Sequence, residues 1–337
     1  MDPEHHSKIV IVGAGIIGLD VALVLAEKGL GRSVTVVAEY LPGDTASTYT
    51  SPWAGCNFSA LSASDEKALR WDRLGYFHLK KLASEKSAES FVSHTPSTEM
   101  WDDTPPYEKI RDMSAYLEDF KLLPSKVLPD GVKFGVSFST VTINAPKHLE
   151  YLYKRLRDEF GITFIQQKIP NVQSAFKSPS TVAVFNCTGV AAGTLAGVQD
   201  SKCYPTRGQV VLARAPWVHQ NTMRHGRDYE TYVIPRPGSN GNVILGGYME
   251  KGDRAERGAQ PGRARSPGCI CGAEAVEEGG TRVEREEVQI GGKRRVIVHN
   301  YGAGGAGFQA GYGMAVDAVG SIEDILRTIT ENPRSCL

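Results

Sequence analysis

The chain has 337 residues, which is enough for a large buried core and for two domains. Its 38 Lys and Arg residues balance 38 Asp and Glu residues, so no net basic field recruits nucleic acid or an anionic membrane. No apolar run is long enough to span a bilayer, and we expect neither a membrane nor a nucleic acid as a partner.

The first predicted elements are a strand, a glycine-rich turn, a helix and a second strand that stops at an acid. The apolar run 9–12 leads into the turn Gly13-Ala14-Gly15-Ile16-Ile17-Gly18, and the second run, 34–37, is followed by Glu39. In this pattern the first glycine permits the turn, the second admits a pyrophosphate and the third packs helix on strand. The helix N-terminus suits phosphate, and Glu39, about 20 residues past the last glycine, suits a ribose hydroxyl. The unit predicts an ADP-containing dinucleotide, with a turn kept only for packing as the alternative.

The middle of the chain alternates between strand and helix patterns. Residues 45–58 are rich in Ser, Thr, Gly and Pro, and we expect them to form a loop beside the cofactor. We expect an amphipathic helix at 65–84 and an irregular stretch at 91–139. Further predicted elements are a strand at 141–143, a helix at 145–159, and strands at 162–166 and 182–185, which return the chain to the nucleotide sheet.

The last third is β-rich and ends in a second glycine loop. Runs at 208–212, 229–234 and 242–245 predict an antiparallel sheet, and 296–298 one more buried strand. A glycine-rich loop at 302–307 precedes a predicted helix that includes Met314 and Leu326. Between these parts, 253–278 has almost no large apolar residues, so it is either an exposed, disordered loop or a local alteration of a once structured segment.

Seven motifs in order along the chain are typical of one flavoenzyme family. They are VGAGIIGLDVA at 12–22, TSPWAG at 50–55, NCTG at 186–189, RGQVV at 207–211, TYVIPRPG at 231–238, ILGG at 244–247 and HNYGAGGAGFQ at 299–309. The chain resembles the D-amino-acid oxidases, which include D-aspartate oxidase, and TSPWAG is most similar to the fungal members.

The resemblance implies an α/β fold, α+β overall, with two domains. A Rossmann-type FAD-binding domain is expected from the discontinuous segments 1–58, 140–200 and 285–337. A substrate domain with an antiparallel sheet is expected from 59–139 and 201–284. The implied cofactor is noncovalent FAD, with no metal, and the implied partners are a D-amino acid and molecular oxygen; a homodimer is the assembly we consider.

The resemblance also implies the reaction and its residues. Hydride leaves the α-carbon of the D-amino acid for the flavin, and the products are a 2-oxo acid, ammonia and hydrogen peroxide. The expected cofactor-binding residues are Gly13, Ala14, Gly15, Ile16, Ile17, Gly18, Glu39, Ser47, Thr48, Ser51, Gly55, Ile169, Thr188, Gly189, Gly302, Gly304, Gly305, Gly307, Phe308 and Gln309. For Ser47, Thr48 and Ser51 the alternative is turn chemistry, and for Gln309 it is a polar helix surface.

Three residues are expected at the reacting end. Tyr232 matches the family tyrosine that bonds the substrate carboxylate, Met223 matches an apolar pocket position, and Gly305 belongs to the second glycine loop. The alternatives are a strand tyrosine half in a core and a core-filling methionine. The loop is expected to bring backbone N–H groups to the flavin edge where negative charge develops.

The family's carboxylate-binding arginine, in a Gly-Leu-Arg-Pro motif, is missing. The segment that follows it in the family is present at 279–284, and counting back places Glu274 at the arginine's position. An anion there would repel the substrate carboxylate. Arg263, Arg265 and Arg282 are the candidate substitutes.

Several functions therefore stay open from sequence alone. We rank an oxidase of neutral D-amino acids first and an acidic-substrate oxidase second, because 246–253 shows no obvious pocket arginine. A flavin-binding protein with impaired turnover is the third reading, and an NAD-dependent dehydrogenase is a weak fourth. The six scattered cysteines and the absence of an apolar signal core predict reduced thiols inside the cell. The C-terminal Ser335-Cys336-Leu337 is an imperfect peroxisomal signal, and a cytoplasmic location is the alternative.

Overall fold

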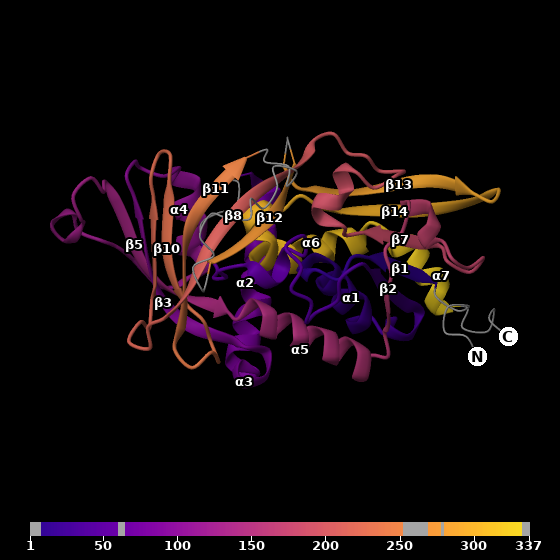
Figure 1. Ribbon diagram of the computed structural model, residues 1–337, viewed down its shortest axis with the longest axis horizontal. Coiled ribbons are helices and arrows are strands. Elements are labelled where there is room, and N and C mark those ends of the chain that lie inside the picture. Colours follow the sequence, from indigo (N-terminus) through magenta and orange to yellow (C-terminus); the bar gives the residue numbers. More distant parts are fainter. Residues whose placement is uncertain (1–7, 60–64, 252–268, 278–279, 332–337) are drawn as a thin grey trace.

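The computed structural model describes residues 8–59, 65–251, 269–277 and 280–331. These residues form two sheets that lie at opposite ends of an elongated molecule, with helices between them (Figure 1). We call them sheet A and sheet B.

Sheet A has six strands in the order β13-β14-β7-β1-β2-β6. All of its neighbouring pairs are parallel except β13 and β14, which form an antiparallel hairpin. The bounds are β1 Ile9–Val12, β2 Val34–Ala38, β6 Thr163–Gln166, β7 Ala183–Asn186, β13 Arg282–Ile290 and β14 Lys293–Tyr301. Parallel strands direct their carboxyl ends to one edge, and that edge is where open α/β sheets bind ligands.

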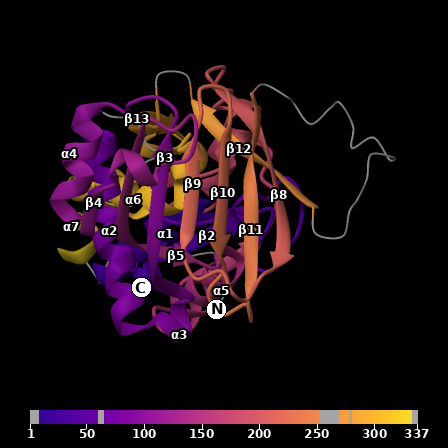
Figure 2. The same cartoon turned by 90° about the vertical axis from the view of Figure 1, so that its left-hand side faces the viewer.

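Sheet B has eight strands in the order β12-β8-β11-β10-β9-β3-β5-β4. Figure 2 shows its strands side by side, facing the viewer. The pairs are antiparallel except β3 and β9, which are parallel. The bounds are β3 Val92–Trp101, β4 Glu118–Leu122, β5 Phe134–Ile143, β8 Cys203–Arg214, β9 Asn221–His225, β10 Glu230–Pro235, β11 Asn242–Lys251 and β12 Cys269–Glu277.

Helices lie between the two sheets and around their outer parts (Figure 1). They are α1 Ile16–Glu27, α2 Glu66–Glu85, α3 Ser87–Ser90, α4 Tyr107–Tyr116, α5 Ala145–Asp158, α6 Gly307–Gly320 and α7 Glu323–Glu331. Asp65 caps α2 by accepting a hydrogen bond from the Ala68 N–H at 3.0 Å. Glycine permits a very close crossing of α2 and α6, because a Cβ on Gly75 would lie 1.7 Å from the carbonyl oxygen of Gln309. The crossing packs α2 against α6, the helix that follows the second glycine loop.

The predicted elements are confirmed in type and order, four of the predicted strands are longer than expected, and two expectations are wrong. The stretch 91–139 is not irregular, since it contains β3, α4, β4 and most of β5. The predicted C-terminal helix is two helices, α6 and α7, separated at Ser321. In the segment 253–278, Cys269–Glu277 forms strand β12 along β8, because backbone hydrogen bonds to a strand edge do not require large apolar side chains; residues 253–268 and 278 lie outside the described residues.

The domain boundary predicted at residue 285 falls inside β13, which joins sheet A from Arg282 onward. Within the described residues, no helix is both long and apolar enough to cross a membrane. The described part of the chain also contains no group of three or more His, Cys, Asp or Glu side chains arranged to hold a metal.

Candidate active site

The first glycine turn has the geometry that the sequence predicts. Gly13 follows β1 with φ +109°, and a Cβ there would lie 2.3 Å from the Cys187 carbonyl oxygen. Gly18 packs so closely that its Cβ would lie 2.0 Å from the Gly13 carbonyl oxygen. The Ile16 N–H at the start of α1 donates to the Ser51 hydroxyl at 3.0 Å. The turn therefore presents a bare backbone and a helix N-terminus, which favour a phosphate group.

A cavity of 1430 Å³ begins at this turn and reaches sheet B. It is lined by the carboxyl end of β2, by the turn, by the second glycine loop and by the cavity-facing side chains of β9 and β10. Its volume exceeds the range of about 300–1,000 Å³ for ordinary small-molecule pockets. An extended dinucleotide together with a small substrate suits a cavity of this length.

Of the expected site residues, all but two line the cavity. The lining includes Gly13, Ala14, Gly15, Ile16, Ile17, Glu39, Thr48, Ser51, Gly55, Ile169, Thr188, Gly189, Met223, Tyr232, Gly302, Gly304, Gly305, Gly307, Phe308 and Gln309. Gly18 lies behind the turn, where it packs α1 against β1. Ser47 is exposed and lies outside the lining.

The ribose end of the cavity is formed after β2. The Glu39 carboxylate accepts from Lys168 Nζ at 3.0 Å and from the Tyr40 hydroxyl at 3.2 Å. The Thr48 hydroxyl donates to the Tyr40 oxygen at 3.0 Å. The pKa of Lys168 is raised by its hydrogen bond and charge interaction with Glu39. This pair holds the carboxylate in place at the carboxyl end of the strand.

The second glycine loop lies between β14 and α6. Gly302 and Gly304 have φ +87° and +54°, so the loop uses backbone conformations that favour glycine. Gln309 is buried rather than on a polar surface, and its side chain accepts from the Ser59 N–H at 3.3 Å and donates to Asp72 at 3.1 Å. Its amide therefore ties α6 to α2 in addition to lining the cavity.

Sheet B supplies the other end of the cavity. Tyr232 on β10 is paired with Met223 on β9, so these two residues are neighbours across the strands. Across β11, Tyr232 pairs with Gly246, where a Cβ would lie 2.3 Å from the Tyr232 ring. The Asn57 amide donates to the Met223 sulfur at 3.3 Å. Glycine on one side and methionine on the other therefore make room for the tyrosine ring.

A charged cluster that the sequence analysis missed lies beside Tyr232. His225 Nε2 lies 3.3 Å from Glu99 Oε2, and His225 Nδ1 lies 3.3 Å from Glu230 Oε1. Glu99 is fully buried, and the His225 ring stacks on Trp101 with centroids 4.8 Å apart. Burial opposes the charged imidazole, but the hydrogen bonds to Glu230 and Glu99 outweigh it and raise the pKa of His225 to about 9.

The Glu99–His225–Glu230 cluster contributes a carboxylate to the cavity, because Glu230 is one of the lining residues. The signal in the sequence was period-two spacing. Glu230 precedes Tyr232 by two residues and His225 follows Met223 by two, so each pair shares a face of its strand.

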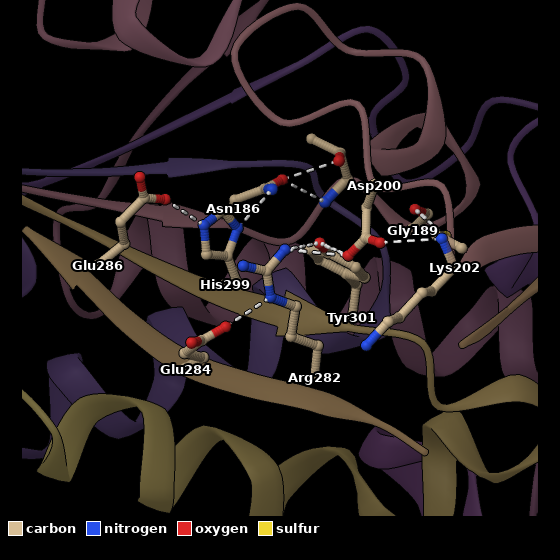
Figure 3. A network of polar contacts seen from close by, with 11 residues as sticks. Asn186, Gly189, Asp200, Lys202, Arg282, Glu284, Glu286, His299 and Tyr301 are labelled. Carbon is tan, nitrogen blue, oxygen red and sulfur yellow. Dashed lines mark hydrogen bonds and ion pairs between the residues drawn. The ribbon is translucent and has the colours of Figure 1, made fainter. Parts of the chain in front are cut away.

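The candidate substitute arginine, Arg282, is already bonded within the protein. Its Nη1 donates to Asp200 at 2.9 Å and to the Tyr301 hydroxyl at 2.7 Å, and its Nε donates to Glu284 at 2.8 Å (Figure 3). Two carboxylates neutralise this guanidinium, so it is not available to hold a substrate carboxylate. Arg263 and Arg265 lie outside the described residues.

The described basic residues of the cavity lining are Lys67 and Lys168. Lys168 pairs with Glu39, and the Lys67 ammonium lies over the Trp71 ring, 4.8 Å from its centroid. Glu274, which the sequence places at the position of the family arginine, is in β12 and is paired with Thr206 of β8. In the described part of the cavity no arginine replaces the missing one.

The fold and the cavity together define a dinucleotide-dependent enzyme with a separate substrate sheet. A model of the FAD-dependent oxidoreductase family matches residues 8–319. The D-amino-acid oxidase of Schizosaccharomyces pombe is 40% identical over 335 residues, which cover 92% of this chain and 94% of that protein. A D-aspartate oxidase of Cryptococcus neoformans is 29% identical and covers 95% of this chain and 98% of its own. The chain belongs to the D-amino-acid oxidase family of FAD-dependent oxidoreductases, and FAD is its cofactor.

Solved structures share the fold at low sequence identity. Glycine oxidase from Geobacillus kaustophilus superimposes with a TM-score of 0.68 at 16% identity, covering 95% of each chain. Iminodiacetate oxidase from a Chelativorans species gives a TM-score of 0.70 at 14% identity, covering 94% of this chain and 95% of that one. The two-sheet architecture is therefore shared with these two oxidases.

Proposed function

We propose that this protein oxidises neutral D-amino acids to 2-oxo acids, ammonia and hydrogen peroxide. The observation that supports this most is the single cavity that joins the dinucleotide turn of sheet A to Tyr232 and Met223 of sheet B. FAD, when bound, accepts the hydride that leaves the substrate α-carbon. The protein's own residues have to bind and orient the amino acid so that the α-hydrogen points at the flavin.

The roles of the residues at the reacting end follow from their positions. Tyr232 donates its hydroxyl hydrogen to the substrate carboxylate, and Met223 provides an apolar contact for the side chain. Gly305 brings backbone close to the reacting atoms, because the glycine loop lines the cavity between the two sheets. Fixed backbone donors at the N-terminus of α6 stabilise the negative charge that develops during hydride transfer.

The Glu99–His225–Glu230 cluster favours neutral over acidic substrates. It contains two carboxylates and one charged imidazole, with the Lys109 ammonium of α4 interacting by charge with both carboxylates, and Glu230 is the carboxylate that lines the cavity, two residues from Tyr232. A second substrate carboxylate near Glu230 would meet a like charge in a poorly solvated site. The oxidation of D-aspartate is therefore the less supported alternative.

A specific observation supports slow turnover as a second feature of the proposal. The bidentate cation that would hold the substrate carboxylate is missing from the described lining, and Arg282 is neutralised by Asp200 and Glu284. One tyrosine hydroxyl replaces a bidentate ion pair poorly, since it supplies one hydrogen bond instead of two and no positive charge. We expect weak substrate binding even where the flavin site is intact.

The test is anaerobic mixing of the FAD-loaded protein with D-alanine, L-alanine or D-aspartate, followed by absorbance of the oxidised flavin. We expect D-alanine to bleach the flavin slowly with no saturation at millimolar concentration, D-aspartate to react more slowly still, and L-alanine not to react. Fast reduction that saturates at micromolar D-alanine would show that another residue holds the carboxylate. Full FAD binding without reduction by any D-amino acid would establish a flavin-binding protein without oxidase activity.

The matched variant for substrate charge is Glu230→Gln. It should raise the reduction rate with D-aspartate relative to D-alanine, because it removes the cavity carboxylate and keeps the side chain's size. An unchanged ratio would show that Glu230 does not face the substrate side chain.

We also propose that oxygen reoxidises the flavin and that the protein works in the peroxisome. The terminal tripeptide Ser335-Cys336-Leu337 lies outside the described residues, and its support is the sequence alone. Fluorescence of a fusion that carries the last residues at its C-terminus tests import, and a diffuse cytoplasmic signal would contradict it. A homodimer is tested by light scattering of the FAD-loaded protein.

A further inference from the structure

The carboxyl end of β14 is fixed by hydrogen bonds on one face of sheet A. His299 lies between Asn186 and Glu286, with its ring nitrogens 3.1 and 2.9 Å from their side chains. Tyr301 lies in the network with Arg282 (Figure 3). Side chains alternate in direction along a strand, so His299 and Tyr301 point one way and the residue between them points the other.

The residue between them is Asn300, and its amide has no partner. Asn300 is fully buried and lines the cavity. Neither its Nδ2 nor its Oδ1 has a hydrogen-bond partner among the described residues. Asn221, which is equally buried, bonds with both amide atoms to the Thr142 hydroxyl at 3.0 and 3.2 Å.

A buried amide without a hydrogen-bond partner indicates that a ligand binds beside it. Buried polar groups in native proteins are almost always hydrogen-bonded, and one left unpaired carries a desolvation penalty. The flanking residues are bonded on the other face of the sheet, which fixes the direction of the Asn300 side chain. A group inside the cavity is therefore the partner that this geometry leaves for it.

The strand order of sheet A indicates which half of FAD lies beside Asn300. Glu39 follows β2 and the phosphate turn follows β1, while β7 and β14 lie on the far side of β1 from β2. Neighbouring strands are about 4.8 Å apart, so the end of β14 lies roughly 10 Å beyond the phosphate turn, away from the ribose end. In an extended FAD molecule the ribityl chain and the flavin continue in that direction.

We propose that Asn300 binds the ribityl–flavin half of FAD, with its amide as both donor and acceptor. Ribityl hydroxyls and the flavin pyrimidine edge offer both kinds of partner, whereas a pyrophosphate only accepts. The hydrogen-bonded His299 and Tyr301 act as positioning residues that hold Asn300 and the following glycine loop in place.

The test measures cofactor binding to the full-length apoprotein without substrate, so its result does not depend on whether D-amino acids are oxidised. Asn300→Leu keeps the approximate shape and removes both polar atoms. Quenching of FAD fluorescence gives the Kd for FAD, and calorimetry gives the Kd for ADP, which lacks the flavin half. We expect FAD binding to weaken roughly tenfold to a hundredfold, with ADP affinity unchanged. The thermal midpoint of the apoprotein should stay the same or rise, because the variant removes an unpaired buried amide.

Asn221→Leu is the matched control, since it removes an equally buried amide that is satisfied inside sheet B. It should lower the stability of the apoprotein and leave the ratio of FAD to ADP affinity unchanged. If Asn300→Leu does not fold, Asn300→Ala gives the same ratio. Equal weakening of FAD and ADP binding, or unchanged FAD affinity, would each overturn the proposal. Unchanged FAD affinity would mean that water satisfies the amide.

Discussion

The Glu99–His225–Glu230 cluster makes the stability of the protein depend on pH in a way that can be calculated. His225 has only 15% of its side chain exposed, and its two carboxylate neighbours raise its pKa from the usual 6.5 to about 9. A raised pKa means that the folded state binds the proton more tightly than the unfolded chain. The stabilisation is complete below pH 6.5 and is lost as the pH rises through about 9. Each pKa unit corresponds to 1.36 kcal/mol, so this group contributes about 3 kcal/mol at pH 6.

We therefore expect His225→Gln to lower the free energy of unfolding by about 3 kcal/mol at pH 6 and by much less at pH 10. Urea unfolding at fixed ionic strength and saturating FAD, at pH 6, 7.5, 9 and 10, measures the difference from the natural protein. His219→Gln, which replaces an exposed histidine, is the control and should show no such trend. A difference between His225→Gln and the natural protein that does not vary with pH would refute the assignment of a charged imidazole to this cluster.

Three further predictions concern the substrate site, the cofactor site and a buried acid in α1. Tyr232→Phe should lower the second-order rate constant for flavin reduction by D-alanine by a factor of roughly 10–150, mainly through weaker substrate binding, since one hydrogen bond to a charged group is lost. Unaltered rapid-mixing kinetics would place Tyr232 outside the substrate site. Glu39→Arg should weaken FAD binding by about 1–3 kcal/mol, because it removes a ribose acceptor and places a second cation beside Lys168; equal FAD affinity in a fluorescence titration would show that Glu39 does not meet the ribose. Asp20 is buried in α1, and desolvation, followed by the charge of Glu27, raises its pKa. The folded state therefore binds this proton more tightly than the unfolded chain, and the protein loses stability as the pH rises through the raised pKa of Asp20. Asp20→Asn should raise the thermal midpoint at pH 8 more than at pH 5, and equal shifts at both would contradict a buried neutral acid.

The first glycine unit could be predicted from the sequence because its interactions are local. Gly13, Gly18 and Glu39 lie within one strand–helix–strand segment, and the spacing of the glycines predicts which backbone segments approach each other closely. The structure confirms this with a Cβ clearance of 2.3 Å at Gly13 and 2.0 Å at Gly18. The second glycine loop was found for the same reason.

Sheet B was only partly predictable, because its inner strands depend on distant partners. β3 contains Pro96 and several polar residues, so it has the composition of a loop, yet it lies between β5 and β9. Proline within a strand argues against a central position when only the sequence is considered. The pairing of β3 with the parallel β9 joins Ser97 to Asn221, and this long-range contact supplies the hydrogen bonds that local composition does not reveal.

The polar contacts of the site were decided by tertiary structure alone. Arg282 is a plausible anion-binding residue in the sequence, and only the fold brings Asp200 and Tyr301 to its guanidinium. Asn300 belongs to the glycine-rich motif that the sequence analysis identified. Whether its amide has a hydrogen-bond partner depends on which side chains the folded sheets place around it. Sequence spacing fixes which residues share a turn or a strand face. Whether a charge is neutralised or a buried amide is left for a ligand depends on side chains that meet only after the chain has folded.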